Sequence, residues 1–306
     1  MESVRETFAA TPELLLRTAR RISDASQLPA SAVTAAARGA APRVRALAPE
    51  LMRDELSGLL MGPGVHLALQ WLADAALLPA LLPELHATID FSQEAGRRHK
   101  DVWEHTKQVV WQSVPRLAVR WAALLHDIGK VPTRTFTPDG KVHFHGHSEV
   151  GARMFDEVAR RFALEPPLRQ KVRFLILHHL RANQYDGSWT DSAVRRFDRE
   201  MGEHMPDLLD LSRADITSKR PGRRQEALRS ISELAGRIEA LREQARKLPP
   251  LPTGLGNAIM GQLGIPPSKR IGDLKRLCEQ AVERGELLAQ QSADYYIEWL
   301  RRAGHG

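Results

Sequence analysis

The stretch RLAVRWAALLHDIGK, Arg116–Lys130, decides how this chain folds. Its apolar residues recur at three- and four-residue spacing, which predicts a helix with one side in a core. The apolar stretch ends on His126 and Asp127, with Gly129 and Lys130 directly behind them. Such a pair can bind a metal ion or can be an ordinary polar helix end, so the rest of the sequence has to distinguish the two interpretations.

Helical periodicity continues on both sides of this stretch. The 306 residues are 42% hydrophobic and 26% charged, a globular composition long enough for one large core or several small ones. One helix is expected to start with Thr11 as N-cap and Pro12 at the first helical position, and others to stop at Gly39, Gly62 and Pro79. Because strands and helices do not alternate, we expect an all-α fold: a helical bundle, a helical region before it and a small helical unit after it.

One segment of the sequence is predicted to form β-strands. The segment TRTFTPDGKVHFHGH (133–147) has a turn signal at 138–140, which predicts a short β-hairpin near 133–145. It follows the His-Asp pair directly, where an active-site loop could lie. We expect His143 and His145 to face opposite sides of this hairpin, so that at most one points inward.

The composition indicates what kind of partner the protein binds and in which cellular compartment it is found. With 44 Lys and Arg against 37 Asp and Glu, the net charge of +7 favours phosphate-bearing partners. The single cysteine, Cys278, excludes an intramolecular disulfide and a cysteine-rich zinc site, and it fits a reducing compartment. Because the sequence has neither a membrane-length apolar run nor a signal-peptide pattern, we predict a cytoplasmic protein with no membrane partner. The sequence does not indicate an oligomeric state.

The histidines are concentrated. Eight of the 12 lie between positions 99 and 179, roughly a quarter of the chain. His105 lies within one predicted helix, His126 and Asp127 end the next, and Asp215 lies on a later one. Imidazole and carboxylate from antiparallel helices can converge on one divalent cation and leave positions open for water.

This order of ligands resembles the HD superfamily of metal-dependent phosphohydrolases, with His105, His126, Asp127 and Asp215 in its four ligand positions. Further segments resemble the HD-containing body of bacterial tRNA nucleotidyltransferases, the CCA-adding enzymes, especially the long actinobacterial type. They are RRHKDVWEHTKQVV, AALLHDIGKVPTRTF, GKVHFHGHSEVGARM, WTDSAVRRF and RADITSK, with weaker neck-like and tail-like segments such as TPELLLRTARRI and GIPPSKRIGDLKRLCEQAVERGEL.

The resemblance implies three parts and one departure. The parts are a helical neck and body region (1–98), an HD domain (99–222) and a helical tail region (223–306). The nucleotidyltransferase head of that family has a Gly-Ser turn and an Asp-x-Asp pair, whereas this sequence has no Asp-x-Asp, and its Gly187-Ser188 pair lies in a loop. We therefore expect a headless relative, natural or a fragment, that does not add CCA by itself.

The activity implied is metal-dependent hydrolysis of a phosphoester in a nucleotide or an RNA end, such as a 2′,3′-cyclic phosphate. One or two ions (Mn, Ni, Co, Fe, Zn or Mg) would bind. His147 and His179 resemble second-metal or phosphate-binding histidines of the superfamily, and His145 and His178 could replace them. With one ion, His147 and His179 would act on the phosphate or protonate the leaving oxygen.

The remaining catalytic and phosphate-binding predictions are less specific. Asp127 would bridge to a second ion, and Lys130 and Arg134 would supply charge to the phosphate, although both could be ordinary loop charges. Arg195 could face the site, but the favoured interpretation of its segment is a helix capped by Thr190, with Val194 and Phe197 in the core.

A non-catalytic alternative stays open. A headless relative could keep only RNA or tRNA binding, in which case the basic run KRPGRRQEALR (219–229) would contact the nucleic-acid backbone instead of being an exposed turn. Trp103, Trp111 and Trp121 fall at helical spacing, so we expect them in the core instead of in base stacking.

Overall fold

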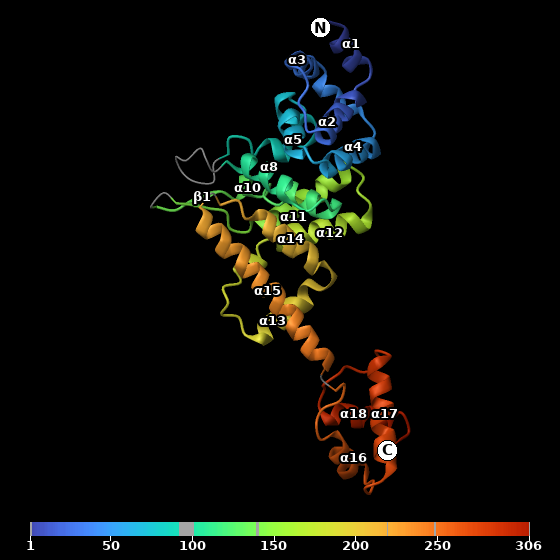
Figure 1. The fold of residues 1–306 in the computed structure, drawn as a ribbon. Coiled ribbons are helices and arrows are strands. Elements are labelled where there is room, and N and C mark those ends of the chain that lie inside the picture. Colours follow the sequence, from blue (N-terminus) through green and yellow to red (C-terminus); the bar gives the residue numbers. More distant parts are fainter. Residues whose placement is uncertain (1, 92–100, 139–140, 219, 248, 306) are drawn as a thin grey trace. The chain divides into compact units, whose positions relative to one another are not determined.

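A computed structural model describes residues 2–91, 101–138, 141–218, 220–247 and 249–305 (Figure 1). Contacts within the chain divide it into two compact units, Met1–Ile238 and Glu239–Gly306. The dividing point falls inside a long helix. The three-part division at residues 98/99 and 222/223 stays a prediction.

Helices build the first unit, and the predicted all-α fold with one short hairpin is confirmed. In chain order its elements are α1 (Glu2–Ala10), α2 (Glu13–Ala25), α3 (Ser31–Ala40), η1 (Ala41–Ala46), α4 (Pro49–Met61), α5 (Val65–Asp74), α6 (Leu78–Leu81), α7 (Pro83–His86), α8 (Val102–Gln112), α9 (Leu117–Leu125), α10 (Lys130–Thr133), β1 (Thr135–Phe136), β2 (Val142–His143), α11 (His147–Arg161), α12 (Pro166–His178), η3 (Ala182–Gln184), α13 (Asp191–Met201), η4 (Gly202–His204), α14 (Met205–Asp215) and the start of α15 (Pro221–Lys247).

Several helix ends differ from the predicted ones. Helix α1 precedes the first predicted helix, and Pro12 is the N-cap of α2 and not its first residue. Helix α3 runs through Gly39, whereas α4 stops at Gly62 as predicted. Helix α5 ends well before Pro79 because the chain turns at Ala76, which has a left-handed φ of 56°. Leu77 N donates to Leu72 O there, a helix-ending hydrogen bond that usually accompanies a glycine in the left-handed conformation. Because the chain has alanine instead of glycine at this position, the sequence did not indicate the helix end.

Helix α9 lies at the centre of the part that carries the site. It packs against α4, α8, α12 and α14, and its residues Val119–Leu125 are all buried. Trp121 and Leu125 are fully buried. The last residues of α9 are therefore held on several sides by apolar packing, which fixes the start of the His-Asp turn.

A buried cation ties α9 to two helix ends. Arg120 is 5% exposed, and its guanidinium donates to Ser113 O (3.1 and 2.9 Å) and to Leu60 O (2.9 Å). Both carbonyls lie at the C-terminal ends of helices, α8 and α4, where the helix dipole favours a positive charge. Burial lowers the pKa of Arg120, and the three hydrogen bonds replace the water that the guanidinium has lost.

The predicted hairpin is confirmed as a two-stranded antiparallel sheet in which Thr135 pairs with His143 and Phe136 with Val142. Its predicted turn includes residues 139–140, which lie outside the described residues. The prediction that His143 and His145 face opposite sides is wrong. Their rings stack with centroids 5.1 Å apart and planes 11° apart, because residues two apart on an extended chain share a side.

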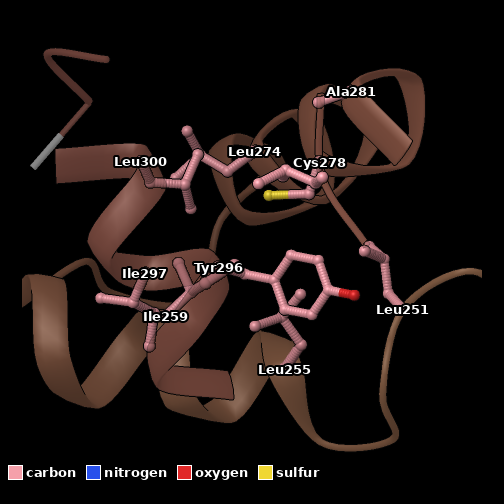
Figure 2. Close-up of a cluster of buried hydrophobic side chains, with 10 residues drawn as sticks. Leu251, Leu255, Ile259, Leu274, Cys278, Ala281, Tyr296, Ile297 and Leu300 are labelled. Atoms are coloured by element: carbon pink, nitrogen blue, oxygen red, sulfur yellow. The ribbon is translucent and has the colours of Figure 1, made fainter. Parts of the chain in front are cut away.

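The second unit consists of the end of α15, α16 (Leu255–Leu263), α17 (Lys269–Glu283) and α18 (Ala293–Arg302). Its core gathers around Tyr296 and Cys278 (Figure 2). The Tyr296 hydroxyl donates to Leu288 O (2.6 Å), so the buried phenol is satisfied. Burial raises the pKa of Cys278 to about 11, which keeps the thiol protonated and unreactive.

The tryptophans separate into core and surface. Trp103 and Trp121 are buried as expected, but Trp111 is 52% exposed and contacts the ring of His66, so its predicted core position is wrong. Helical spacing alone did not identify the solvent side of α8. Among the described helices, none combines the length and apolar composition that a bilayer span requires.

Candidate metal centre

The His-Asp pair lies in the turn that follows α9. His126 is the C-cap of that helix and is 1% exposed, and its Nδ1 donates to Ala123 O (2.9 Å). Because a carbonyl oxygen can only accept, this bond leaves the Nε2 lone pair free to act as a ligand. The local helix end thus orients the ring before any other residue of the site contributes.

Two further histidines are held in the same way. His147, at the start of α11, donates from Nδ1 to Phe144 O (2.9 Å), and His179, the C-cap of α12, donates from Nδ1 to Ile176 O (2.7 Å). Each bond joins the ring to the carbonyl three residues earlier. All three histidines therefore direct Nε2 away from their own backbone, as metal-ligating histidines do when a backbone carbonyl holds the other nitrogen.

The fourth histidine uses a side-chain partner. His105, on α8, has its Nδ1 2.9 Å from Thr217 Oγ1, just after α14. Asp215 is the last residue of α14, so the chain brings a carboxylate and this hydroxyl to the same place. Nothing in the sequence pattern singled out Thr217, although it lies two residues after the predicted ligand Asp215.

The first group of donors has separations suited to one ion. His105 Nε2 lies 3.2 Å from His126 Nε2, 3.0 Å from Asp215 Oδ1 and 3.5 Å from Asp127 Oδ2. His126 Nε2 lies 3.3 Å from Asp127 Oδ2 and 3.4 Å from Asp215 Oδ1. Ligand atoms about 2.1 Å from a common ion stand about 3.0 Å apart at a right angle and about 3.4 Å apart at the tetrahedral angle. The donor set therefore fits a divalent cation.

A second group shares Asp127. His147 Nε2 lies 3.6 Å and His179 Nε2 3.9 Å from Asp127 Oδ1, and the two nitrogens are 3.3 Å apart. Each oxygen of the Asp127 carboxylate thus faces one of the two groups that could hold an ion. A carboxylate in this position can bridge two cations.

The charges of the first group compensate one another in the metal-free protein. Burial lowers the pKa of His126, but the Asp127 and Asp215 carboxylates outweigh it and raise that pKa to about 10. Burial would raise the pKa of Asp127, yet His126 and Lys130 hold it well below its usual range. Hydrogen bonds with His105 and His126 likewise hold the pKa of Asp215 well below its usual range. A proton on His126 therefore stands where a cation would lie, and cation binding has to displace it.

In the second group, the pKa values of the histidines are lowered instead of raised. Burial lowers the pKa of His147, and burial together with the charge on His126 lowers the pKa of His179 to about 4. Both rings are therefore neutral near pH 7, the form in which imidazole can bind a metal.

Of the other predicted site residues, Lys130 contacts this cluster. Lys130 Nζ donates to Asp127 Oδ2 (2.7 Å), which brings its charge to the edge of the first group. Arg134 is exposed and lies over the ring of Phe91, and Arg195 is exposed on α13. Thr190 caps α13 by accepting from Ala193 N, as predicted.

The two neighbouring histidines that were alternatives contact other rings. The ring of His178 contacts Phe174 with centroids 4.4 Å apart, and His145 stacks on His143. The structure therefore brings His147 and His179, and not these neighbours, against Asp127.

Gly129, in the His-Asp turn, permits a close approach that the sequence did not reveal. A Cβ at this position would lie 2.1 Å from His147 O and 2.6 Å from Gly151 N. The absence of a side chain therefore lets the first turn of α11, with His147, approach the turn that carries Asp127.

The region that carries this cluster matches a known family. Residues 88–220 match the family model described as "HD domain". The chain is 34% identical over 257 residues to an "A-adding tRNA nucleotidyltransferase" of Deinococcus radiodurans, covering 81% of this chain and 58% of the relative. It is 33% identical over 263 residues to a "CC-adding tRNA nucleotidyltransferase" of Thermus thermophilus, covering 82% and 57%. A "Multifunctional CCA protein" of Pseudomonas aeruginosa is 31% identical over 193 residues, covering 60% and 46%.

The chain thus spans about half the length of the curated relatives that it matches. The buried His and Asp cluster lies within the matched HD region. The chain therefore contains an HD domain at residues 88–220 and is similar to tRNA nucleotidyltransferases over about half of their length.

Proposed function

We propose that this protein is a metal-dependent phosphohydrolase that cleaves phosphoesters of nucleotides or RNA ends, such as 2′,3′-cyclic phosphates. The observation that carries the proposal is the position of Asp127, whose two carboxylate oxygens face two separate groups of histidine donors. Taking these polar groups out of water costs free energy, which a bound cation would help to offset. An HD domain is consistent with hydrolase chemistry at this level.

In this proposal His105, His126, Asp127 and Asp215 hold the first cation. His147 and His179, with Asp127, hold a second one, or they contact the phosphate themselves when a single cation binds. A bound divalent cation would polarise a phosphoryl oxygen and increase the acidity of water beside it. Mixed imidazole and carboxylate donors suit manganese, iron, cobalt, nickel or zinc, and magnesium less well.

The protein's own groups supply the remaining steps. The Asp127 carboxylate accepts the hydrogen bond of Lys130, which holds the ammonium beside the cluster, within reach of a non-bridging phosphate oxygen. When a single cation binds, a histidine of the second group, neutral near pH 7, can accept a proton from the attacking water at Nε2 and then donate it to the leaving oxygen. Arg134 and Arg195 are proposed as further phosphate contacts.

Hydrolysis assays with paired variants test the proposal. Metal-stripped protein is assayed on 2′,3′-cyclic nucleotides with and without manganese, nickel or cobalt. We expect metal-dependent turnover that His126→Ala and His179→Ala abolish. His178→Ala is the matched control, because that ring contacts Phe174 and not Asp127. Equal losses from His178→Ala and His179→Ala would contradict the assigned roles.

A second candidate, a non-catalytic tRNA-binding protein, is favoured by one observation. The Deinococcus and Thermus relatives, whose names say that they act on tRNA, align with more than four fifths of this chain, well beyond the HD match. The proposed neck (1–98) and tail (223–306) would then contact tRNA. Wild-type protein that binds tRNA but hydrolyses no phosphoester with any of the metals would favour this candidate. The double variant His126→Ala/Asp127→Ala, losing hydrolysis but keeping tRNA binding, would favour the enzyme.

A further inference from the structure

Three aromatic rings and two cations form a connected series beside the cluster. Lys130 Nζ lies 5.7 Å from the centroid of Phe144, whose ring is 6.2 Å from that of Phe91. The Arg134 guanidinium lies 4.2 Å over Phe91 and 5.4 Å from Phe136. We call these five residues the aromatic–cation face. It begins at the Asp127 carboxylate, which accepts from Lys130, and ends at Phe136 on β1.

Strand geometry explains why these side chains share a side. Arg134 and Phe136 are two residues apart, and Phe136 is paired with Val142, two residues before Phe144. Side chains at such positions point to the same side of a hairpin. Phe91 is tied to the first turn of α8, because Val102 N donates to Phe91 O (3.0 Å). The hairpin therefore carries its rings on one side and the stacked His143 and His145 on the other.

The outer end of the face is open. Phe136 is 61% exposed and Arg134 is exposed, while Phe91 and Phe144 are half-buried. A single exposed phenylalanine is common on protein surfaces and needs no partner. Here the exposed ring ends a continuous series that leads to a proposed phosphate-handling centre, and the Arg134 cation lies between it and the Phe91 ring. A purely apolar partner would bury those cations without compensation.

Unpaired nucleotides have the two chemical groups that this combination of aromatic rings and cations can bind. A base stacks on an aromatic ring whatever its sequence, and each nucleotide brings a phosphate for a neighbouring guanidinium or ammonium. The net charge of +7 has the sign that a polyanion requires.

We propose that the aromatic–cation face binds the unpaired nucleotides next to the reacting phosphate of a single-stranded RNA end, with a base stacked on Phe136. This rests on the proposed function only for the position of the reacting phosphate. The preferred substrate is then an oligonucleotide end and not a free mononucleotide.

Binding to metal-free protein tests the face without requiring turnover. Fluorescence anisotropy with a short, unpaired, labelled RNA gives the Kd of each variant. Phe136→Ala should weaken binding by about 5- to 100-fold, the effect of removing one stacked base, whereas Phe136→Trp should bind as wild type does. Arg134→Ala should reduce the slope of log Kd against log salt by about one. Trp111→Ala is the control, since that exposed ring contacts His66 and not the face. Wild-type affinity in Phe136→Ala, or a larger loss in Trp111→Ala, would overturn the proposal.

Hydrolysis separates this inference from the proposed function. If the protein is a phosphohydrolase, Phe136→Ala should raise KM for an oligonucleotide that ends in a 2′,3′-cyclic phosphate and leave KM for the 2′,3′-cyclic mononucleotide unchanged. An equal effect on both substrates would overturn the inference but not the enzyme. If wild type hydrolyses neither substrate, the proposed function fails, and the anisotropy result alone decides whether the face binds RNA.

Discussion

Replacing Gly129 with alanine should move His147, in the second group of donors, away from Asp127 and leave the first group in place. Gly129 has an ordinary right-handed backbone (φ −68°, ψ −14°), so alanine introduces no backbone strain and only the new methyl group matters. That Cβ would lie 2.1 Å from His147 O, whereas real Cβ contacts stay above 3.0 Å. The first turn of α11 must therefore move by at least about 0.9 Å, the difference between these distances. The movement displaces His147 relative to Asp127.

The expected cost is that of overpacking, about 1–3 kcal/mol in the free energy of unfolding. Urea denaturation of metal-free protein measures it. Gly151→Ala is the matched control on the facing helix, because a Cβ there meets its nearest atoms at 3.5–3.6 Å, an ordinary contact. In a metal titration, Gly129→Ala should bind a cation more weakly at the second group of donors and with unchanged affinity at the first group. If Gly129→Ala is as stable as Gly151→Ala and binds metal equally, the reasoning about this contact is refuted.

Three further predictions concern single side chains. Thr217→Val should lower affinity for a divalent cation by about 10- to 100-fold by releasing His105, as titration calorimetry would show, and an unchanged affinity would contradict its role. Because the pKa of His179 is about 4 in the folded protein and near 6.5 unfolded, the unfolded state alone takes up this proton as pH falls through that interval. Metal-free protein should therefore lose stability over this range, and His179→Gln should reduce the loss measured by urea denaturation at several pH values; an equally steep loss in the variant would exclude this cause. Arg120→Met should lower the free energy of unfolding by about 2–3 kcal/mol, because two helix-end carbonyls lose a charged donor, and wild-type stability would argue against that bonding.

Helical periodicity predicts the all-α fold and the turn signal at 138–140 predicts the hairpin, because both depend on local patterns of apolar and turn residues. The helix ends were less predictable. The left-handed turn at Ala76 occurs without a glycine, so no residue type marked it. The exposure of Trp111 depends on which helices cover α8, which spacing along one helix does not specify.

Four of the six predicted metal ligands, His105, His126, Asp127 and Asp215, could be selected from residue type and order. His147 and His179 were selected only through the family resemblance. The structure brings the donor atoms of all six together. The features that orient them could not be selected in this way. Thr217 contacts His105 across 112 positions of sequence, and the close approach at Gly129 depends on where α11 begins. The faces of His143 and His145 should have been predictable, since a two-residue period places them on one side.

Metal retention tests the central claim most directly. Purified protein is stripped with chelator, incubated with manganese, nickel, cobalt, iron or zinc, passed through a desalting column and analysed for its elements, beside His126→Ala and the control His178→Ala. The account predicts one or two ions retained per chain by wild type and by His178→Ala, and a loss of retained ion in His126→Ala. Wild-type protein that retains none of these metals would contradict a metal centre at Asp127.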